Sequence, residues 1–194
     1  MGALAAVCIG AYLVASLNWA IVVLRALGHG DPRTRASRNP GTSNVYRLAG
    51  PLWAAVVLVL DVGRAALVAW AALRLLPLEL APLAALALVL GNRFPLWHGF
   101  RGGKGVASLL GFTAVLHPLA ALFACGAWVI VSMLGRVHYV GSLAMIAALA
   151  GGAVLRCGWG YSSVLGTATA LAVIVLAHSP NFREGVTGTG RDSR

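Results

Sequence analysis

Charged side chains are scarce in this chain, and that shortage excludes a water-soluble domain. Only 10% of the 194 residues are charged and 59% are hydrophobic, whereas a soluble domain carries about 25% charged residues. Apolar stretches of about 20 residues, the length needed to cross a bilayer, recur along the sequence. We therefore predict an all-α integral membrane protein that forms a single membrane-embedded domain over residues 1–194.

Cysteine, acidic residues and the common catalytic motifs are also lacking. The three cysteines, Cys8, Cys125 and Cys157, lie in or beside apolar runs without metal-ligand spacing, so neither a disulfide framework nor a metal site is indicated. The chain contains no Gly-x-Ser-x-Gly nucleophile motif, and none of its five histidines has an aspartate five positions later. We expect no metal and no cofactor, and a reaction here would need a substrate that is already activated.

The apolar runs predict seven membrane-spanning helices, two or three of them short. Pro118 interrupts one run that is too long for a single span, because proline removes a helix hydrogen bond and clashes with the preceding turn. The first segment has no clear cleavage site and is expected to remain as a helix. The predicted spans cover about residues 3–27, 51–76, 80–91, 106–116, 118–134, 143–155 and 163–177.

Basic residues gather in alternate breaks between these spans. Twelve of the 15 Lys and Arg residues fall in breaks on one side, and two fall in breaks on the other. The positive-inside rule then predicts an N-terminus outside the cell and a cytoplasmic C-terminus. Because the arginines occupy short breaks, the net charge of +10 indicates membrane lipid as a partner rather than nucleic acid. The predicted cytoplasmic segments are about 28–50, 92–105, 135–142 and 178–194.

The first long polar break is dense in groups that bind oxyanions. It includes SRNPGTSNVYRLAG, Ser37 to Gly50, in which hydroxyls and amides alternate with glycine and two arginines. An arginine guanidinium can hold a phosphate through two parallel hydrogen bonds. An ordinary cytoplasmic turn also explains the Asn-Pro-Gly sequence, so both interpretations stay open. The candidate phosphate ligands are Ser37, Arg38, Asn39, Thr42, Ser43, Asn44 and Arg47.

The second polar break contains Lys104, the only lysine in the chain, among glycines in the sequence FRGGKGV. The Walker A pattern fails on both sides of this lysine, which argues against a nucleoside triphosphatase. Consecutive glycines still let backbone amides converge on an anion, and the N-terminus of the following helix favours negative charge. We predict a phosphate site at Gly102, Gly103, Lys104 and Gly105, while a flexible turn with a snorkelling lysine is the plainer alternative.

Two further polar places carry weaker signals. His178 and Asn181 begin the tail where the last helix is expected to leave the membrane, and a polar anchor explains them as well as catalysis does. Asp61 and Arg64 lie three residues apart within a predicted span, so they can pair with each other. Both pairs are candidates for function, the second only as a secondary one.

Taken together, these segments resemble the acyl-phosphate:glycerol-3-phosphate acyltransferases. SRNPGTSNVYRLAG resembles their first motif, G-S-x-N-x-G-A-T-N-x-x-R-x-x-G, and NRFPLWHGFRGGKGVAS resembles their second, G-H-x-F-P-x-F-x-x-F-x-G-G-K-G-V-A-T. RVHYVGSLA and HSPNFREGVTG resemble the third region and the tail of the family. The resemblance runs from about Ala15 to Gly190, which is nearly the whole chain.

The resemblance implies a bacterial inner-membrane enzyme of seven helices whose active site faces the cytoplasm. Such an enzyme transfers a fatty acyl group from acyl phosphate to the sn-1 hydroxyl of glycerol 3-phosphate, the first step of phospholipid synthesis, and releases lysophosphatidic acid and phosphate. The enzyme that produces acyl phosphate is a candidate partner. The implied catalytic residues are Ser37, Arg47, Lys104, His178 and Asn181, and the implied substrate-binding residues are Asn39, Gly41, Asn44, Gly102, Gly103, Gly105 and Ser142.

This sequence departs from the family pattern at several positions. The departures, each followed by the family's residue, are Asn18 (proline), Ala36 (glycine), Arg64 (lysine), Ala65 (glycine), Asn92 (histidine) and Gly190 (glutamate). None removes a phosphate ligand from the first two motifs, but no role is carried over to position 190. A small membrane transporter or channel for an organic phosphate is the alternative, although no internal repeat is evident. A CDP-alcohol phosphotransferase would need a cluster of aspartates that the chain lacks.

Overall fold

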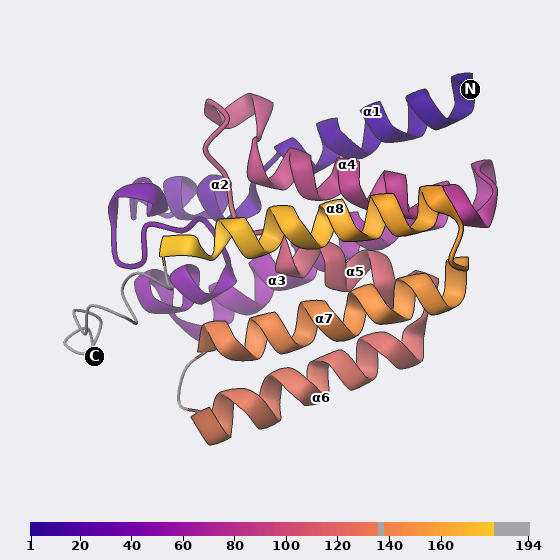
Figure 1. Ribbon diagram of the computed structural model, residues 1–194. Helices are drawn as coiled ribbons and strands as arrows, with labels where there is room; N and C mark the ends of the chain where they lie inside the picture. Colours follow the sequence, from indigo (N-terminus) through magenta and orange to yellow (C-terminus); the bar gives the residue numbers. More distant parts are fainter. Residues whose placement is uncertain (136–137, 181–194) are drawn as a thin grey trace.

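The computed structural model describes residues 1–135 and 138–180, and every regular element within them is helical. The helices lie side by side and form an elongated bundle (Figure 1). Short 3-10 turns in the connections are η1 (Pro32–Thr34), η2 (Leu78–Leu80) and η3 (Leu96–His98). The α-helices are α1 (Gly2–Ser16), α2 (Trp19–Ala26), α3 (Thr42–Leu75), α4 (Ala81–Arg93), α5 (Val106–Leu116), α6 (Pro118–Gly135), α7 (His138–Cys157) and α8 (Tyr161–Ala177).

Seven apolar segments of the bundle correspond to the seven predicted spans. The segments long and apolar enough to cross a membrane are Gly2–Ala26, Thr42–Leu75, Leu78–His98 and Tyr139–Cys157. The shorter ones are Val106–Leu116, Pro118–Leu134 and Tyr161–Ala177. The prediction of an all-α fold with two or three short spans is therefore confirmed. α1 begins at one end of the bundle and α8 ends at the other, as an odd number of passes requires (Figure 1).

The first predicted span is interrupted in the structure. α1 stops at Ser16, Leu17 is extended, and Asn18 starts α2 by accepting a hydrogen bond from the Ile21 amide at 3.1 Å. An asparagine side chain in this N-cap position stabilises a helix start by about 1 kcal/mol. α2 is therefore a separate short helix beside the polar connections, where the hydropathy pattern predicts one continuous helix over 3–27.

α3 begins at Thr42, well before the predicted start at Pro51. Proline has no backbone N–H and disturbs a helix that runs through it, and Gly50 takes a left-handed φ of 85° at this point. The kink joins a short first part of α3, which contains much of the first motif, to the long apolar part. Most of the first motif is therefore helical rather than a loop.

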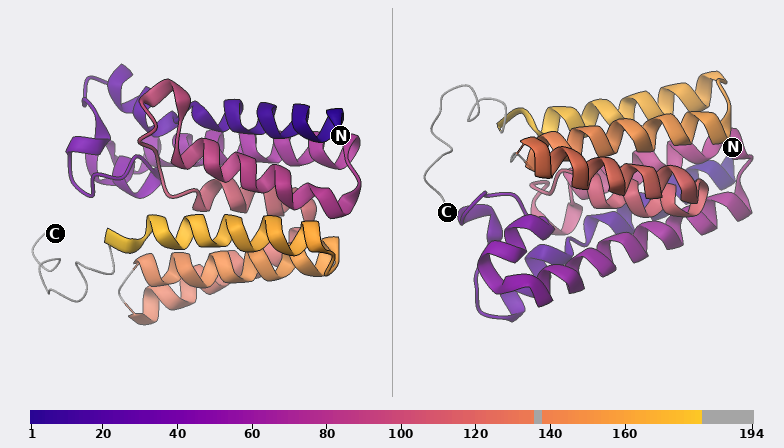
Figure 2. Two further views of the ribbon diagram at one scale, coloured as in Figure 1. Left: turned by 45° about the horizontal axis from the view of Figure 1, so that its top comes forward. Right: turned by 90° about the horizontal axis from the view of Figure 1, so that it is seen from below.

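α5 starts inside the bundle rather than at its end. Its 11 residues span about 16 Å at about 1.5 Å per residue, which is about half of a hydrocarbon core. The chain reaches α5 by turning back from η3 into the bundle (Figure 2). After α5 the chain reverses at His117 and Pro118 into α6, which confirms the predicted split at the proline.

Small residues let the helices approach closely, as is usual in membrane bundles. A Cβ on Gly91 of α4 would lie 2.3 Å from the Tyr12 carbonyl oxygen of α1, and one on Gly111 of α5 would lie 2.3 Å from the Val62 carbonyl oxygen of α3. Three buried apolar clusters result. One comes mainly from α1, α3 and α4, one mainly from α6, α7 and α8, with α4 and α5 contributing to both, and a smaller one comes from α2 and α3. This packing holds α5 in the middle of the bundle.

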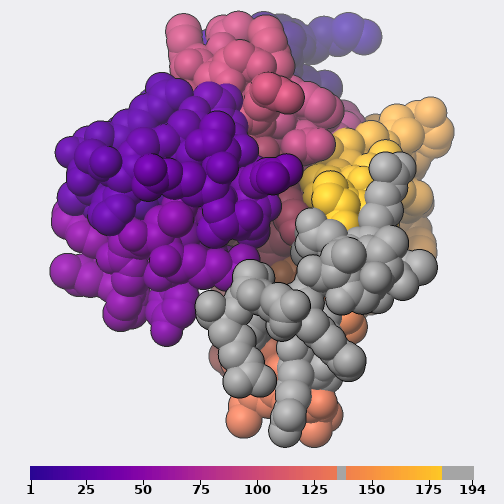
Figure 3. All heavy atoms as spheres, turned by 90° about the vertical axis from the view of Figure 1, so that its left-hand side faces the viewer, coloured from indigo at the N-terminus to yellow at the C-terminus, as the bar shows by residue number. Residues whose placement is uncertain are grey.

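The polar connections gather at one end of the bundle. η1, η3, α2 and the start of α3 lie there, together with the end of α8 (Figure 2). Figure 3 looks onto this end and shows the α2–α3 region beside the α4–α5 connection and the last turn of α8. The predicted segments 28–50 and 92–105 and the start of the predicted segment 178–194 thus share one end of the protein.

Candidate active site

The glycine stretch is buried at the centre of this polar end. Gly102, Gly103 and Gly105 are all buried. A Cβ on Gly102 would lie 2.0 Å from the Asn92 carbonyl oxygen, and one on Gly103 would lie 3.0 Å from the Pro40 carbonyl oxygen. Gly105 is the N-cap of α5 and has a φ of +90°, a conformation that favours glycine. The stretch can pass between α4 and the first polar loop because Gly102 and Gly103 have no side chains.

Two helix N-termini meet at this point. The close approach of Gly103 to Pro40 places the start of α5 beside that of α3, whose N-cap is Gly41. No described side chain caps either helix, and the buried Thr42 hydroxyl has no hydrogen-bond partner among the described residues. Asn39 is half-buried just ahead of α3. Because free amides and the helix dipole attract anions, we call residues 41–42 and 102–105 together the anion cradle.

His178 and Lys104 lie beside the glycine stretch. His178 is 2% exposed, its Nδ1 lies 2.8 Å from the Ile174 carbonyl oxygen, and Ile174 lies 3.5 Å from the position of a Cβ on Gly105. Burial lowers the pKa of His178 and the charge of Lys104 adds to this, while the bond to Ile174 acts in the opposite direction. Since a carbonyl only accepts, the neutral ring carries its proton on Nδ1 and has its lone pair on Nε2.

The loop before α3 is shaped by Asn44, which is fully buried. Its amide nitrogen donates to the carbonyls of Pro32 at 3.0 Å and Arg35 at 3.2 Å, and its side-chain oxygen accepts from the Ser37 amide at 3.2 Å. These bonds hold Ala36 in the left-handed region, with a φ of 47°, at a position where the family pattern has glycine. Asn44 therefore shapes the loop, and its contact with a substrate stays a prediction.

Asp31 and Arg33 fasten this loop to the chain that precedes the glycine stretch. Arg33 donates to the Asp31 carboxylate at 2.7–3.1 Å, and to the carbonyls of His98 at 2.5 Å and Arg101 at 3.2 Å. Arg25 adds a bond to Asp31 at 2.8 Å. The bonds from Arg33 hold the pKa of Asp31 well below its usual range. This clamp is not among the predicted site residues; its signal in the sequence is Asp-Pro-Arg, in which the aspartate caps η1 ahead of a proline.

A buried charged network lies directly behind the anion cradle. Arg64 forms an ion pair with Asp61 at 2.7 Å, as their spacing predicts, and donates to the Asn92 side-chain oxygen at 2.9 Å. The Asn92 carbonyl in turn accepts the Gly103 amide at 3.0 Å. Arg64 and Asn92, two residues that depart from the family pattern, are thus in direct contact.

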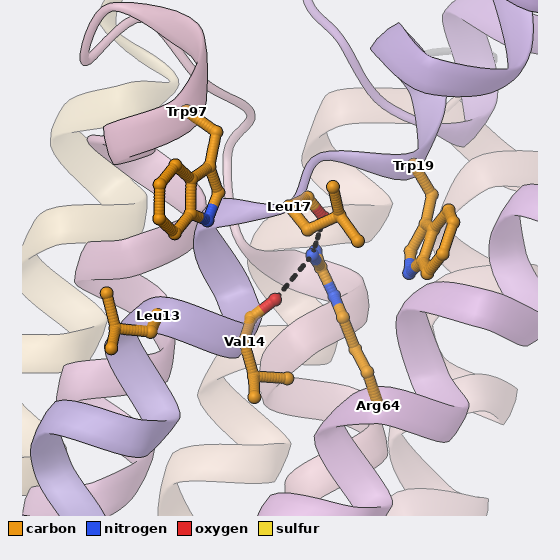
Figure 4. Close-up of a pocket in the computed structure, with 6 residues that line it drawn as sticks. All are labelled: Leu13, Val14, Leu17, Trp19, Arg64 and Trp97. Atoms are coloured by element: carbon orange, nitrogen blue, oxygen red, sulfur yellow. Dashed lines mark hydrogen bonds between the residues drawn. The ribbon is translucent and has the colours of Figure 1, made fainter.

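An open, mainly apolar cavity of about 500 Å³ adjoins this network. Figure 4 shows the two indole rings on either side of it and the Arg64 guanidinium directed toward the end of α1. A cavity with such walls suits a hydrocarbon chain. The residues that line it are Leu13, Val14, Leu17, Trp19, Arg64 and Trp97.

Two of the predicted catalytic residues, Ser37 and Arg47, form no hydrogen bond or ion pair with the anion cradle within the described residues. Ser37 and Arg47 are exposed, and Arg47 has no hydrogen bond or ion pair within residues 1–135 and 138–180. Ser142 is half-buried on α7, while Asn181 and the departure at Gly190 lie outside the described residues. No group of His, Cys, Asp and Glu in the described part is arranged to hold a metal.

Comparisons with known sequences extend over nearly the whole chain. The family described as Glycerol-3-phosphate acyltransferase matches residues 5–188. A protein of Bordetella petrii with that name is 35% identical over 92% of this chain and 88% of its own length. Another, from Chromohalobacter salexigens, is 36% identical over 97% of this chain and 93% of its own length.

Solved structures agree with the sequence comparisons. The glycerol 3-phosphate form of PlsY, an integral membrane glycerol 3-phosphate acyltransferase, matches with a TM-score of 0.88 at 27% identity and covers 95% of this chain and 92% of that one. The lysophosphatidic acid form of the same protein matches with a TM-score of 0.84 at 26% identity. Sequence and architecture thus show together that this chain is an integral membrane acyltransferase and belongs to the PlsY glycerol-3-phosphate acyltransferase family.

Proposed function

We propose that this protein transfers a fatty acyl group from acyl phosphate to the sn-1 hydroxyl of glycerol 3-phosphate, giving lysophosphatidic acid and inorganic phosphate. The reaction takes place at the cytoplasmic face of the bacterial inner membrane, as the first step of phospholipid synthesis. The observation that carries this proposal is the anion cradle, where two helix N-termini converge beside Lys104. The names of the relatives and of the matching structures support glycerol 3-phosphate as the acceptor.

The phosphoryl group of acyl phosphate binds in the anion cradle. The amides in the first turn of α5 and the ammonium of Lys104 face a group whose negative charge grows as it leaves. Donors fixed at such a place lower a barrier by about 3–4 kcal/mol for each strong contact. The glycerol oxygen attacks the acyl carbon and the bond from that carbon to the phosphate oxygen breaks, so no covalent enzyme intermediate is needed.

Glycerol 3-phosphate binds between the anion cradle and the exposed side of the first loop. The guanidinium of Arg47 has no partner in the described chain and is suited to a phosphate, and Ser37 and Asn39 lie on the same loop. Asn181 and Ser142 complete the predicted contacts. Holding two substrates in the correct orientation contributes about 7–11 kcal/mol to lowering the barrier.

The proton of the attacking hydroxyl has two candidate acceptors. His178 is one, because its neutral ring has a lone pair on Nε2 and burial keeps its pKa below the ordinary value. A phosphate oxygen of the substrate is the other, since the second pKa of a phosphate monoester is about 6. The pH dependence described in the Discussion separates the two.

The acyl chain of the donor occupies the apolar cavity beside Arg64. The cavity is next to the buried network that contacts Gly103, so a chain in it can reach from the anion cradle toward the lipid. A Leu13→Trp variant narrows this cavity and should shift the preference toward shorter acyl chains. The preference is measured with acyl phosphates of graded length, and an unchanged preference would show that the acyl chain does not bind in this cavity.

Phosphate release from purified protein tests the reaction. With acyl phosphate as donor, release should depend on glycerol 3-phosphate and should be lost in Lys104→Ala. A parallel assay uses acyl-CoA in place of acyl phosphate, and equal rates with acyl-CoA would contradict the proposal that acyl phosphate is the donor. Arg156→Ala, which removes an exposed cation at the end of α7, is the control and should remain active. Activity that survives in Lys104→Ala would refute the role of the anion cradle.

A further inference from the structure

Arg64 lies in the middle of a predicted span rather than near its end, and it is almost completely buried. Arg64 is 7% exposed and its partner Asp61 is 6% exposed. Burying an ion pair costs desolvation energy, and such pairs often stabilise a fold no better than apolar residues do. The pair therefore calls for an explanation beyond stability, and the other contacts of the guanidinium point to one.

One arm of contacts runs from Arg64 to the glycine half of the anion cradle. Its Nη2 donates to the Asn92 side chain at 2.9 Å. Asn92 ends α4 together with Arg93, and the carbonyls of these two residues accept the amides of Gly103 and Gly102, both at 3.0 Å. One side chain thus separates Arg64 from the start of the glycine stretch.

The other arm runs to the half of the anion cradle at α3. Arg64 Nη1 donates to the Ala15 carbonyl at 3.0 Å. It also donates to the Leu17 carbonyl, where α1 ends (Figure 4). The next residue, Asn18, donates through its side chain to the Pro40 carbonyl at 3.2 Å. Pro40 directly precedes Gly41, the N-cap of α3. Both halves of the anion cradle therefore lead back to the same guanidinium.

We propose that Arg64, held in place by Asp61, is a positioning residue that sets the spacing between the two helix N-termini of the anion cradle. This inference rests on the proposed function, because the spacing matters where two phosphates must be held for one transfer. Arg64 lines the apolar cavity but contacts neither phosphate; it acts on the anion cradle through Asn92 on one side and Asn18 on the other. A planar guanidinium can donate to Asn92 and to the end of α1 at once. The lysine of the family pattern, which goes with a histidine at position 92, would do this less well opposite Asn92.

The test replaces the planar guanidinium of Arg64 by a lysine ammonium and so keeps the positive charge. In Arg64→Lys, kcat for phosphate release should fall about 100-fold, as expected for a misplacement of about 1 Å. The KM values for acyl phosphate and glycerol 3-phosphate should each stay within about threefold, because either phosphate still finds its own helix N-terminus. Arg74→Lys, an exposed position on the same helix, is the matched control and should keep wild-type kcat.

Two further variants, Asn92→Ala and Asn18→Ala, test the same inference if Arg64→Lys does not fold. Asn92→Ala and Asn18→Ala each remove one arm and leave the buried ion pair intact, and each should lower kcat more than it changes either KM. Combined with Arg64→Lys, each should add less than its own effect, because they share one pathway. Wild-type kcat in all folded variants, or a loss of thermal stability with kcat unchanged, overturns the inference. Wild-type protein that is itself inactive refutes the proposed function and this inference with it.

Discussion

The two halves of the anion cradle are built in opposite ways. The half at α5 includes three buried glycines, and Gly102 passes the Asn92 carbonyl at a distance that no side chain would allow. The half at α3 is preceded by a loop that is held by side chains, above all by the fully buried Asn44 and by the clamp of Asp31 with Arg33. A larger side chain should therefore disturb the half at α5, whereas a truncated side chain should disturb the half at α3.

The largest effect is expected at His178, which packs on the glycine half. A general base contributes about 10²–10⁴-fold, so His178→Gln should lower kcat/KM within that range if this residue takes the proton. Its pKa lies below the usual value of about 6.5; the stability that the neutral ring contributes is complete above about pH 6.5 and is lost as pH falls through the lowered pKa.

The pH profile of kcat/KM then separates the two candidate bases. With His178 as the base, the profile falls on the acid side below about pH 6.5 and His178→Gln loses this limb. With a substrate phosphate as the base, the limb persists in the variant. A variant with full activity would remove His178 from the mechanism altogether.

A single methyl group on the glycine half should have the next largest effect. In Gly102→Ala the new Cβ would lie 2.0 Å from the Asn92 carbonyl oxygen, so the backbone must move, and phosphate release should fall by about 100-fold. Gly126→Ala on α6, where nothing lies within 4 Å, is the control. Similar activity in the two variants would show that the close packing is not required.

Removing atoms from the loop half should cost stability first and activity second. Asn44→Ala leaves three backbone groups of the loop without their partner, and an unsatisfied buried group costs about 1–3 kcal/mol. We expect a lower thermal midpoint in detergent and a smaller loss of activity than in Gly102→Ala. Tyr46→Phe, 60% exposed and nearby on α3, should change neither, and an unchanged midpoint in Asn44→Ala would refute its role in the loop.

The smallest effect is expected where the loop half already tolerates a strained residue. Ala36 has a φ of 47°, which costs a residue with a Cβ about 1–2 kcal/mol, while glycine costs about 0.5–1 kcal/mol more in chain entropy on folding. Ala36→Gly should therefore raise stability by about 0–1.5 kcal/mol and leave activity unchanged. Ala26→Gly, exposed at the end of α2, should lower stability instead, and a lower midpoint for Ala36→Gly would show that no strain is present.

Much of the fold is visible in the sequence because apolar length and proline act locally. The seven apolar runs, the reversal at His117 and Pro118, and the entry of the glycine stretch into a helix all appear as predicted. The break at Asn18 was missed, since one polar residue barely changes the hydropathy of a long run. The early start of α3 was missed as well, because the proline at its kink is also typical of a helix start.

Composition and short-range geometry are enough to show that the chain lies in a membrane and that its predicted phosphate-binding motifs are rich in glycine, amides and cations. The meeting of two helix N-termini, and the contacts by which Arg64 reaches both through Asn92 and Asn18, appear only in the folded chain. These contacts join residues far apart in the chain, and they depend on how closely α1, α3 and α4 pack, which no local pattern specifies.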